Sequence, residues 1–234
     1  MAMRLDHYQL STRNIYATAQ KLRDETGLGF YDGGYFTSGG IANKIFPLGR
    51  GCYLEVEGVV DAGIIDKDLG AKVFFERTAE GECFSLNGMR VDTMEEMQAL
   101  AKRFGSELKG GASRVRPNGP QVYGYSTPTG THAGHAAATG EVTHPDRAGK
   151  VTWYYFPDMY LHPSGQPVFN WPGCVEPLGI SFLEVGGTEA EMTEWLGVPA
   201  KNFPYRFNGK AQGLYAIGVN TSDGEKIIRR PSRQ

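Results

Sequence analysis

The sequence has 234 residues, of which 40% are hydrophobic and 21% charged, ordinary usage for a globular protein. Lysine and arginine number 24 against 26 acidic residues, so no excess of positive charge is present to neutralise phosphates, and we expect no nucleic-acid partner. A chain of this length buries a core without covalent staples, as one large domain or as two packed halves.

The cysteines and the N-terminal residues bear on where the protein works. Cys52, Cys83 and Cys174 are widely spaced and form no CxxC pair, which favours reduced thiols over a disulfide framework. The first residues lack the basic and apolar regions of a signal peptide, and no apolar run approaches the length of a membrane span. We therefore expect a cytoplasmic protein with no membrane partner.

The first sixty residues predict a strand, a helix and three strands. Residues 5–10 alternate apolar and polar side chains, which is typical of a half-buried strand and places His7 and Gln9 on one face. A capped helix follows and ends by Gly27. The pair Gly33-Gly34 is interpreted as a turn. The three later strands are predicted over residues 29–36, 41–47 and 51–60.

The same order then begins again, which predicts an internal repeat. A strand over 84–91 and a helix over 93–104 are followed by a glycine pair at Gly110-Gly111, again interpreted as a turn. Residues 127–149, rich in glycine, alanine and threonine and without hydrophobic periodicity, are expected to form a long mobile loop. Further strands are predicted over 121–126, 151–156 and 166–171. A third, shorter cycle is predicted with strands over 180–185, 203–207, 213–220 and 225–229 and a helix over 188–196.

Several short segments carry a resemblance to a known family. Those in the first sixty residues are Leu5-Asp6-His7, Gly33-Gly34, Asn43, Pro47-Leu48-Gly49 and Tyr53-Leu54-Glu55. Those in the later part are Arg116-Pro117-Asn118-Gly119, Pro167-Val168-Phe169-Asn170-Trp171 and Pro177-Leu178-Gly179-Ile180. In order and spacing they resemble the bacterial glyoxalase-like domain family of the vicinal oxygen chelate (VOC) superfamily, over most of the chain.

The resemblance implies an α+β fold. Tandem βαβββ modules of the glyoxalase/bleomycin-resistance/dioxygenase-like kind would curl around a shared cavity, with a third partial repeat. On this basis we expect a first module over residues 1–65 and a second over 66–175, which contains the loop 127–149. The partial third repeat and tail would occupy 176–234, and all three parts would form one compact unit.

The resemblance also implies a site. In such modules the first strand offers a histidine and the fourth a glutamate, positions matched here by His7 and Glu55, which would bind a divalent metal such as Zn, Fe, Mn, Co or Ni. Many members carry a further histidine after the paired glycines, where this chain has Tyr35 and Phe36. We expect Tyr35 to join His7 and Glu55 in catalysis. In the second half, the position comparable to Glu55 is predicted to be Asn170.

Aromatic and polar side chains around these positions are expected to bind a planar small-molecule substrate. The expected substrate-binding residues are Tyr53, Phe36, Phe169, Asn170, Trp171 and Tyr155. The loop histidines, His132, His135 and His144, have three interpretations: further metal ligands, solvated loop residues, or acids and bases delivered by a lid.

Three functions follow as hypotheses. The first is a metal-assisted lyase, isomerase or ring-opening enzyme acting on a small aromatic or carbonyl-bearing metabolite. The second is a metal-free protein that binds and sequesters a drug or metabolite. The third is a metal-free acid/base enzyme that uses His7 and Glu55. A homodimer is compatible with each of them.

Overall fold

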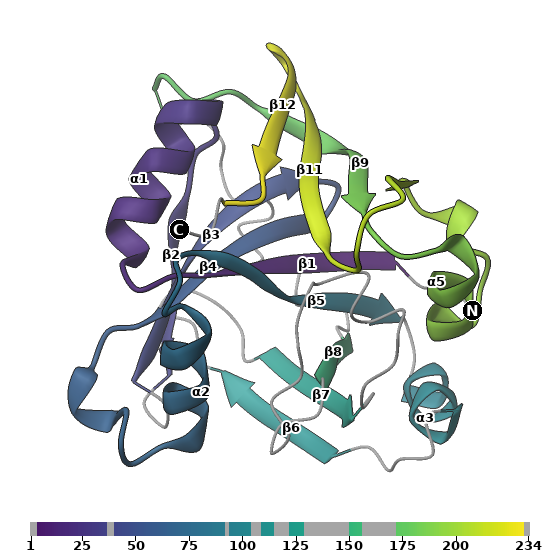
Figure 1. The fold of residues 1–234 in the computed structure, drawn as a ribbon, viewed down its shortest axis with the longest axis horizontal. Helices are drawn as coiled ribbons and strands as arrows, with labels where there is room; N and C mark the ends of the chain where they lie inside the picture. The colour runs from purple at the N-terminus through teal and green to yellow at the C-terminus, as the bar shows by residue number, and fades with distance from the viewer. Residues whose placement is uncertain are drawn as a thin grey trace.

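The protein forms two mixed sheets with short helices between their strands (Figure 1). The computed structural model describes residues 4–36, 40–91, 94–103, 109–114, 122–128, 150–155 and 172–231. An eight-stranded sheet has the order β2-β3-β4-β1-β5-β8-β7-β6, and a four-stranded sheet has the order β10-β9-β11-β12. The predicted α+β class is confirmed.

The first module has the predicted strand–helix–three-strand order. Asn14 caps its helix by accepting a hydrogen bond from the Ala17 N–H, and Gly27 ends it at a positive φ of 75°. Strand β1 pairs in parallel with β4, so the first and last strands of the module are neighbours. The elements are β1 (Arg4–Ser11), α1 (Ile15–Thr26), β2 (Tyr31–Phe36), β3 (Ile41–Gly49) and β4 (Cys52–Val59).

The second module repeats this arrangement, which confirms the internal repeat. Its elements are β5 (Cys83–Val91), α3 (Met94–Arg103), β6 (Lys109–Arg114), β7 (Val122–Pro128) and β8 (Lys150–Tyr155). Strand β5 pairs in parallel with β8, as β1 does with β4, and β1 and β5 join the modules as an antiparallel pair across the middle of the molecule (Figure 1). The expected loop beyond residue 128 and the expected strand over 166–171 lie outside the described residues.

Two expectations about turns were wrong in the same way. Gly33-Gly34 lies inside β2, and Gly110-Gly111 lies inside β6. Both pairs coincide with an irregularity in strand register, between Asp32 and Gly34 and between Lys109 and Ala112. A glycine inside a strand often marks a bulge, so the glycines bend the second strand of each module without reversing the chain.

The segment between the modules holds two helices that we did not predict. A 3-10 turn, η1 (Ala62–Ile64), is capped by Asp61, and α2 (Leu69–Arg77) is capped by Asp68, whose side chain accepts from the Ala71 N–H. The α2 segment begins Leu-Gly-Ala and has only nine residues, so its periodicity is too short to detect in the sequence.

The third unit again runs strand, helix, three strands, but its sheet is ordered differently. Its first strand is paired in parallel with its second and antiparallel with its third, whereas in the two modules the first strand pairs with the fourth. Thr188 and Glu191 form a capping box at the start of its helix. The elements are β9 (Pro177–Val185), α5 (Glu189–Leu196), η2 (Ala200–Asn202), β10 (Tyr205–Phe207), β11 (Leu214–Thr221) and β12 (Gly224–Arg229).

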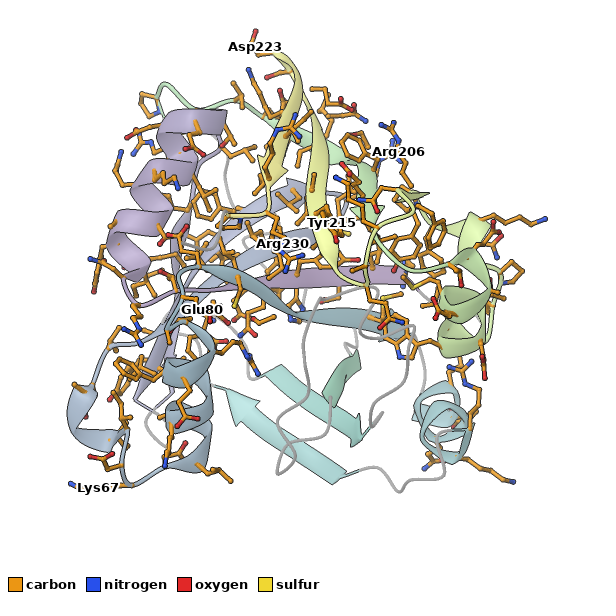
Figure 2. All side chains as sticks on the ribbon, viewed as in Figure 1. Lys67, Glu80, Arg206, Tyr215, Asp223 and Arg230 are labelled. Atoms are coloured by element: carbon orange, nitrogen blue, oxygen red, sulfur yellow. The ribbon has the colours of Figure 1, made fainter. Side chains whose placement is uncertain are left out.

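Cations lie over aromatic rings of this sheet. The Arg206 guanidinium lies 4.0 Å from the centre of the Phe182 ring, and the Arg230 guanidinium lies 5.3 Å from that of Tyr215. Arg206, Tyr215 and Arg230 are labelled in Figure 2. Such contacts contribute on the order of 0.5–1 kcal/mol at exposed positions.

The main core lies between the first module and the third unit. Tyr8 and Leu10 of β1 are each 1% exposed and belong to the same cluster of buried residues as Trp195 of α5. The other members include Phe46, Leu48, Leu54, Val56, Leu183, Val185 and Ile217. One face of β1 and β4 is therefore occupied by apolar packing, which leaves the polar side chains of these strands on the opposite face. None of the described helices is long and apolar enough to span a membrane.

Arg103 ties the end of α3 to the end of α5. Its guanidinium donates a hydrogen bond to the Trp195 carbonyl in the last turn of α5, where unsatisfied carbonyl groups attract a cation. Partial burial lowers the pKa of Arg103 from its usual range. The contact joins the second module to the third unit.

Candidate functional site

The polar face of β1 and β4 brings His7 and Glu55 together. Strand pairing sets His7 opposite Tyr53 and Gln9 opposite Glu55, so these four residues share one face. The His7 Nε2 and Glu55 Oε2 atoms are 3.7 Å apart. His7 is 1% exposed and Glu55 is 4% exposed, so the pair is shielded from bulk water and its electrostatic interactions are strong.

The His7 ring is held between two strands. On one side it stacks on Tyr53, with ring centres 4.8 Å apart and planes 11° from parallel. On the other side it lies over Gly88 of β5, where a Cβ atom would come within 3.1 Å of Nε2 and closer still to Cε1 and Nδ1. Gly88 therefore makes room for the imidazole, and any larger residue would displace it.

Asp6 joins the pair through a β-bulge. Leu5 pairs with Met89 and His7 with Gly88, which leaves Asp6 as an extra residue on β1. Its Oδ1 lies 3.8 Å from His7 Nδ1, and its side chain is fully buried. Strict alternation would turn consecutive side chains to opposite faces, and the bulge re-aims this one. His7 thus lies between two carboxylates, Asp6 and Glu55.

Asn43 holds the other oxygen of Glu55. Its Nδ2 donates a hydrogen bond to Glu55 Oε1, so the two carboxylate oxygens face different partners, Asn43 and His7. The Asn43 Oδ1 is buried without a hydrogen-bond partner in the described structure and packs against Gly33, where a Cβ atom would overlap it. Asn43 was among the residues that carried the family resemblance, but the sequence did not indicate its contact with Glu55.

A short chain of hydroxyl groups continues the polar face beyond Gln9. Ser85 Oγ donates to Gln9 Oε1 at 3.0 Å, and the Ser11 and Ser85 Oγ atoms are 2.5 Å apart. Ser85 is the extra residue of a second bulge, because Gln9 pairs with Leu86 and Leu10 with Phe84. Each of the two central strands therefore places a bulge residue next to the site.

The structure does not bring Tyr35 to the pair. Tyr35 is 52% exposed and pairs with Ala42, whose neighbour Asn43 lies on the face of Glu55. Tyr35 therefore points away from that face. Its catalytic role gains no support from this placement.

Of the expected substrate-binding residues, only Tyr53 has a described side chain, and its ring stacks on His7. Phe36 ends β2 and Tyr155 ends β8, and the side chains of both lie outside the described part of the chain. Phe169, Asn170 and Trp171 also fall outside it, as do His132, His135 and His144. The shared cavity and the roles of these residues stay predictions.

Behind the site, two tyrosines lie in the core. The hydroxyl groups of Tyr8 and Tyr205 are buried. Burial raises the pKa of Tyr205 to about 12, and burial, with a smaller contribution from Tyr205, raises the pKa of Tyr8 well above its usual value. These phenols are neutral at physiological pH and help pack the first module onto the third unit.

Comparison with known proteins places this arrangement in a family. The model of the glyoxalase-like domain matches residues 5–156, more than half of the chain and the whole of both modules. The chain belongs to the glyoxalase-like domain family of the VOC superfamily. A search of curated proteins returns no match.

One of two similar solved structures shares the fold of this glyoxalase-like protein. A hypothetical protein from Staphylococcus aureus superposes with a TM-score of 0.57 at 12% identity, covering 100% of this chain and 88% of its own. The methylmalonyl-CoA epimerase from Mycobacterium tuberculosis gives a TM-score of 0.44 at 15% identity, covering 66% of this chain and 89% of its own. The first likeness concerns the fold alone, and we infer no activity from the second.

The two modules of this glyoxalase-like chain are unequal at the site. The first strands of the two modules, β1 and β5, are antiparallel neighbours, and His7 pairs with Gly88 while Gln9 pairs with Leu86. When one module is compared with the other, His7 of β1 therefore matches Leu86 of β5, and Gln9 matches Gly88. Gly88 pairs with Thr152 as Gln9 pairs with Glu55, so Thr152 occupies the position comparable to Glu55. Asn170, which we expected to occupy it, lies beyond the end of β8 at Tyr155 and outside the described residues.

This inequality decides how well a metal fits. Superfamily members often use a divalent metal, and a catalytic metal site needs about three protein donors. Here the first module supplies His7 and Glu55, with Asp6 at the other nitrogen of the imidazole, while the matching positions of the second module hold Leu86 and Thr152. Among the described residues, no group of three or more His, Cys, Asp or Glu side chains is placed to hold a metal. Within the described part of the chain, the donors on this face do not make up a site for a resident metal.

Proposed function

We propose that this chain is an enzyme that moves a proton at a carbon next to a carbonyl group of a small molecule, with His7 and Glu55 as its acid–base pair. The observation that carries the proposal is the buried pair itself, with His7 Nε2 3.7 Å from Glu55 Oε2. Two titratable groups in contact inside a protein are a common arrangement for proton transfer.

The surroundings of the pair support this role. Tyr53 and Gly88 define the plane of the imidazole, and Asn43 defines which carboxylate oxygen faces it. Groups held in one orientation lose little entropy when a substrate reacts, and a proton is transferred over a short, fixed path. Shielding from water also prevents solvent from competing for the proton.

The proposed step covers both isomerase and lyase chemistry. One member of the pair removes the proton from carbon, and the electron pair of the broken C–H bond passes into the carbonyl to give an enolate. Return of a proton to the other face of the carbon completes an isomerisation. In a lyase reaction, the electron pair of the enolate forms a C=C bond to the adjacent carbon, and a group leaves that carbon with the electron pair of its own bond.

Deuterium uptake tests the proposal on a panel of candidate substrates. Small ketones, thioesters and 2-hydroxy acids are incubated with the metal-stripped protein in D2O, and loss of the α-proton signal is followed by NMR. We expect exchange of at least one compound, reduced at least about 100-fold in His7→Gln and in Glu55→Gln. Equal exchange in wild type and Glu55→Gln would contradict the proposal. So would a ligand that binds tightly and shows no exchange, because the protein would then be a binding protein.

A further inference from the structure

Gln9 lies beside the acid–base pair with only one end of its amide engaged. It is opposite Glu55 in the sheet, and its side chain is 7% exposed. Its Oε1 accepts the hydrogen bond from Ser85 Oγ at 3.0 Å. Within the described structure its Nε2 makes no hydrogen bond. Among the described residues, the amide therefore has a satisfied acceptor and no acceptor for its two N–H donors. Its Nε2 is not one of the fully buried polar atoms that lack a partner, so a ligand or water can reach it.

Ser11 and Ser85 fix which way the amide faces. Ser85 has one O–H, which it donates to Gln9, so in its 2.5 Å contact with Ser11 the Ser11 hydroxyl must be the donor. Both serines are fully buried, so no bulk water competes for these bonds. The chain of hydrogen bonds runs in one direction, from Ser11 through Ser85 to Gln9 Oε1, and leaves the Nε2 hydrogens as its open end.

We propose that Gln9 Nε2 is the donor that binds the carbonyl oxygen of the substrate, and that Ser85 and Ser11 are positioning residues that orient it. The inference rests on the proposed function, since it places the acceptor next to the pair that moves the proton. As the proton leaves carbon, negative charge develops on the carbonyl oxygen, so this hydrogen bond strengthens during the reaction.

The same geometry narrows the ligand class. The oxygen that faces Gln9 belongs to a ketone, ester, thioester or amide, all of which accept a hydrogen bond and carry no charge. A carboxylate is disfavoured because Glu55 and Glu57 lie on the neighbouring strand, on the same face as Gln9. We therefore expect neutral carbonyl compounds to bind better than the corresponding acids.

Binding to the full chain can be followed at Gln9 itself. The Nε2 hydrogens give a pair of signals in a 1H–15N spectrum, assigned by their loss in Gln9→Met. The probes are acetophenone and cyclohexanone, each compared with the alcohol of the same shape, 1-phenylethanol and cyclohexanol. We expect a ketone to move the Gln9 signals to saturation and its alcohol to bind more weakly.

Two serine variants give the test its control. Ser85→Ala frees the amide to turn, and we expect it to raise the Kd of the ketone about 10-fold, the usual effect of losing one hydrogen bond. Ser181→Ala removes a buried serine hydroxyl on β9, which has no hydrogen-bond partner in the described structure, and should leave the Kd unchanged. Thermal unfolding of both variants shows that they remain folded.

The inference is overturned if neither ketone moves the Gln9 signals, if Ser85→Ala binds the ketone as tightly as wild type does, or if the alcohol binds more tightly than the ketone. The last result would mean that the amide is reversed. Ketone binding at Gln9 without α-proton exchange of any panel compound would contradict the proposed function alone. Exchange with unmoved Gln9 signals would contradict this inference alone.

Discussion

Substituting Gly88 by alanine should disable His7 while leaving the fold in place. The new Cβ would lie 3.1 Å from His7 Nε2 and inside the contact limit of Cε1 and Nδ1, so the ring would have to move by about 1 Å to restore normal contacts. Tyr53 blocks the opposite direction by stacking on the ring. Overpacking of this kind costs about 1–3 kcal/mol, and the lower chain entropy of alanine offsets about 0.4–1 kcal/mol of it.

A displacement of that size matters more for activity than for stability, because about 1 Å of misplacement costs about 100-fold in rate. We expect Gly88→Ala to lower the rate of α-proton exchange by about that factor and to unfold at slightly lower denaturant concentration. Gly34→Ala is the matched control, since a Cβ there would meet no atom within 4 Å. Loss of the upfield ring-current shift of the His7 imidazole protons would report the displacement directly. Unchanged exchange and an unchanged His7 spectrum in Gly88→Ala would refute the reasoning.

Three further variants test other contacts. Asn43→Asp places a second carboxylate against Glu55 Oε1 in place of an N–H donor. We expect the rate of α-proton exchange to fall about 10- to 100-fold. If the variant kept the wild-type rate, Asn43 would not position Glu55. Arg103→Ala removes the cation bound to the Trp195 carbonyl and should lower the free energy of unfolding by about 1 kcal/mol in a urea titration, after allowance for its partial exposure. For Tyr205, the folded pKa of about 12 lies above the unfolded value of 10.0, so above pH 10 the unfolded chain loses its proton first and stability falls as the pH rises towards 12. The loss is up to about 1.4 kcal/mol per pH unit, and Tyr205→Phe should remove that part of the alkaline slope in a series of urea titrations.

The order of the elements could be predicted from the sequence because it depends on local patterns. The alternation around His7, the Asn14 and Gly27 ends of α1, and the Thr188 capping box are each encoded within a few residues. The placement of His7 and Glu55 on one face follows from the same alternation, because every second side chain of a strand lies on the same face of the sheet.

The parts that could not be predicted depend on register and bulges. A glycine pair has the same sequence pattern whether it bends a strand or reverses the chain, so this pattern does not distinguish the pairs in β2 and β6 from turns. Asp6 and Ser85 contact the site only because each is an extra residue in its strand, and no local pattern reveals an extra residue. The sequence gives only weak signals for the contacts of Asn43 and Gln9. It shows that Asn43 has a carboxamide and that Gln9 shares a face with His7, but it does not show which groups these two side chains bind.

The strand order of the third unit was also beyond local patterns. Its sequence repeats the order of elements in the modules, and only the long-range pairing of β9 with β10 and β11 distinguishes its sheet from theirs. Short connections favour pairing between strands that follow one another in the sequence. The third unit pairs in this way, and among the described residues it has no matching second unit with which to form a larger sheet, as the two modules do.

The most direct test of the central claim is the rate of α-proton exchange in metal-stripped protein, measured for wild type and for Glu55→Gln. Glutamine keeps the size of the side chain and a hydrogen-bonding oxygen towards Asn43 but cannot take up a proton. We predict that stripping leaves the wild-type rate unchanged and that Glu55→Gln lowers it at least about 100-fold. Exchange that disappears on stripping and returns with added divalent metal, or full exchange in Glu55→Gln, would contradict the acid–base role of the pair.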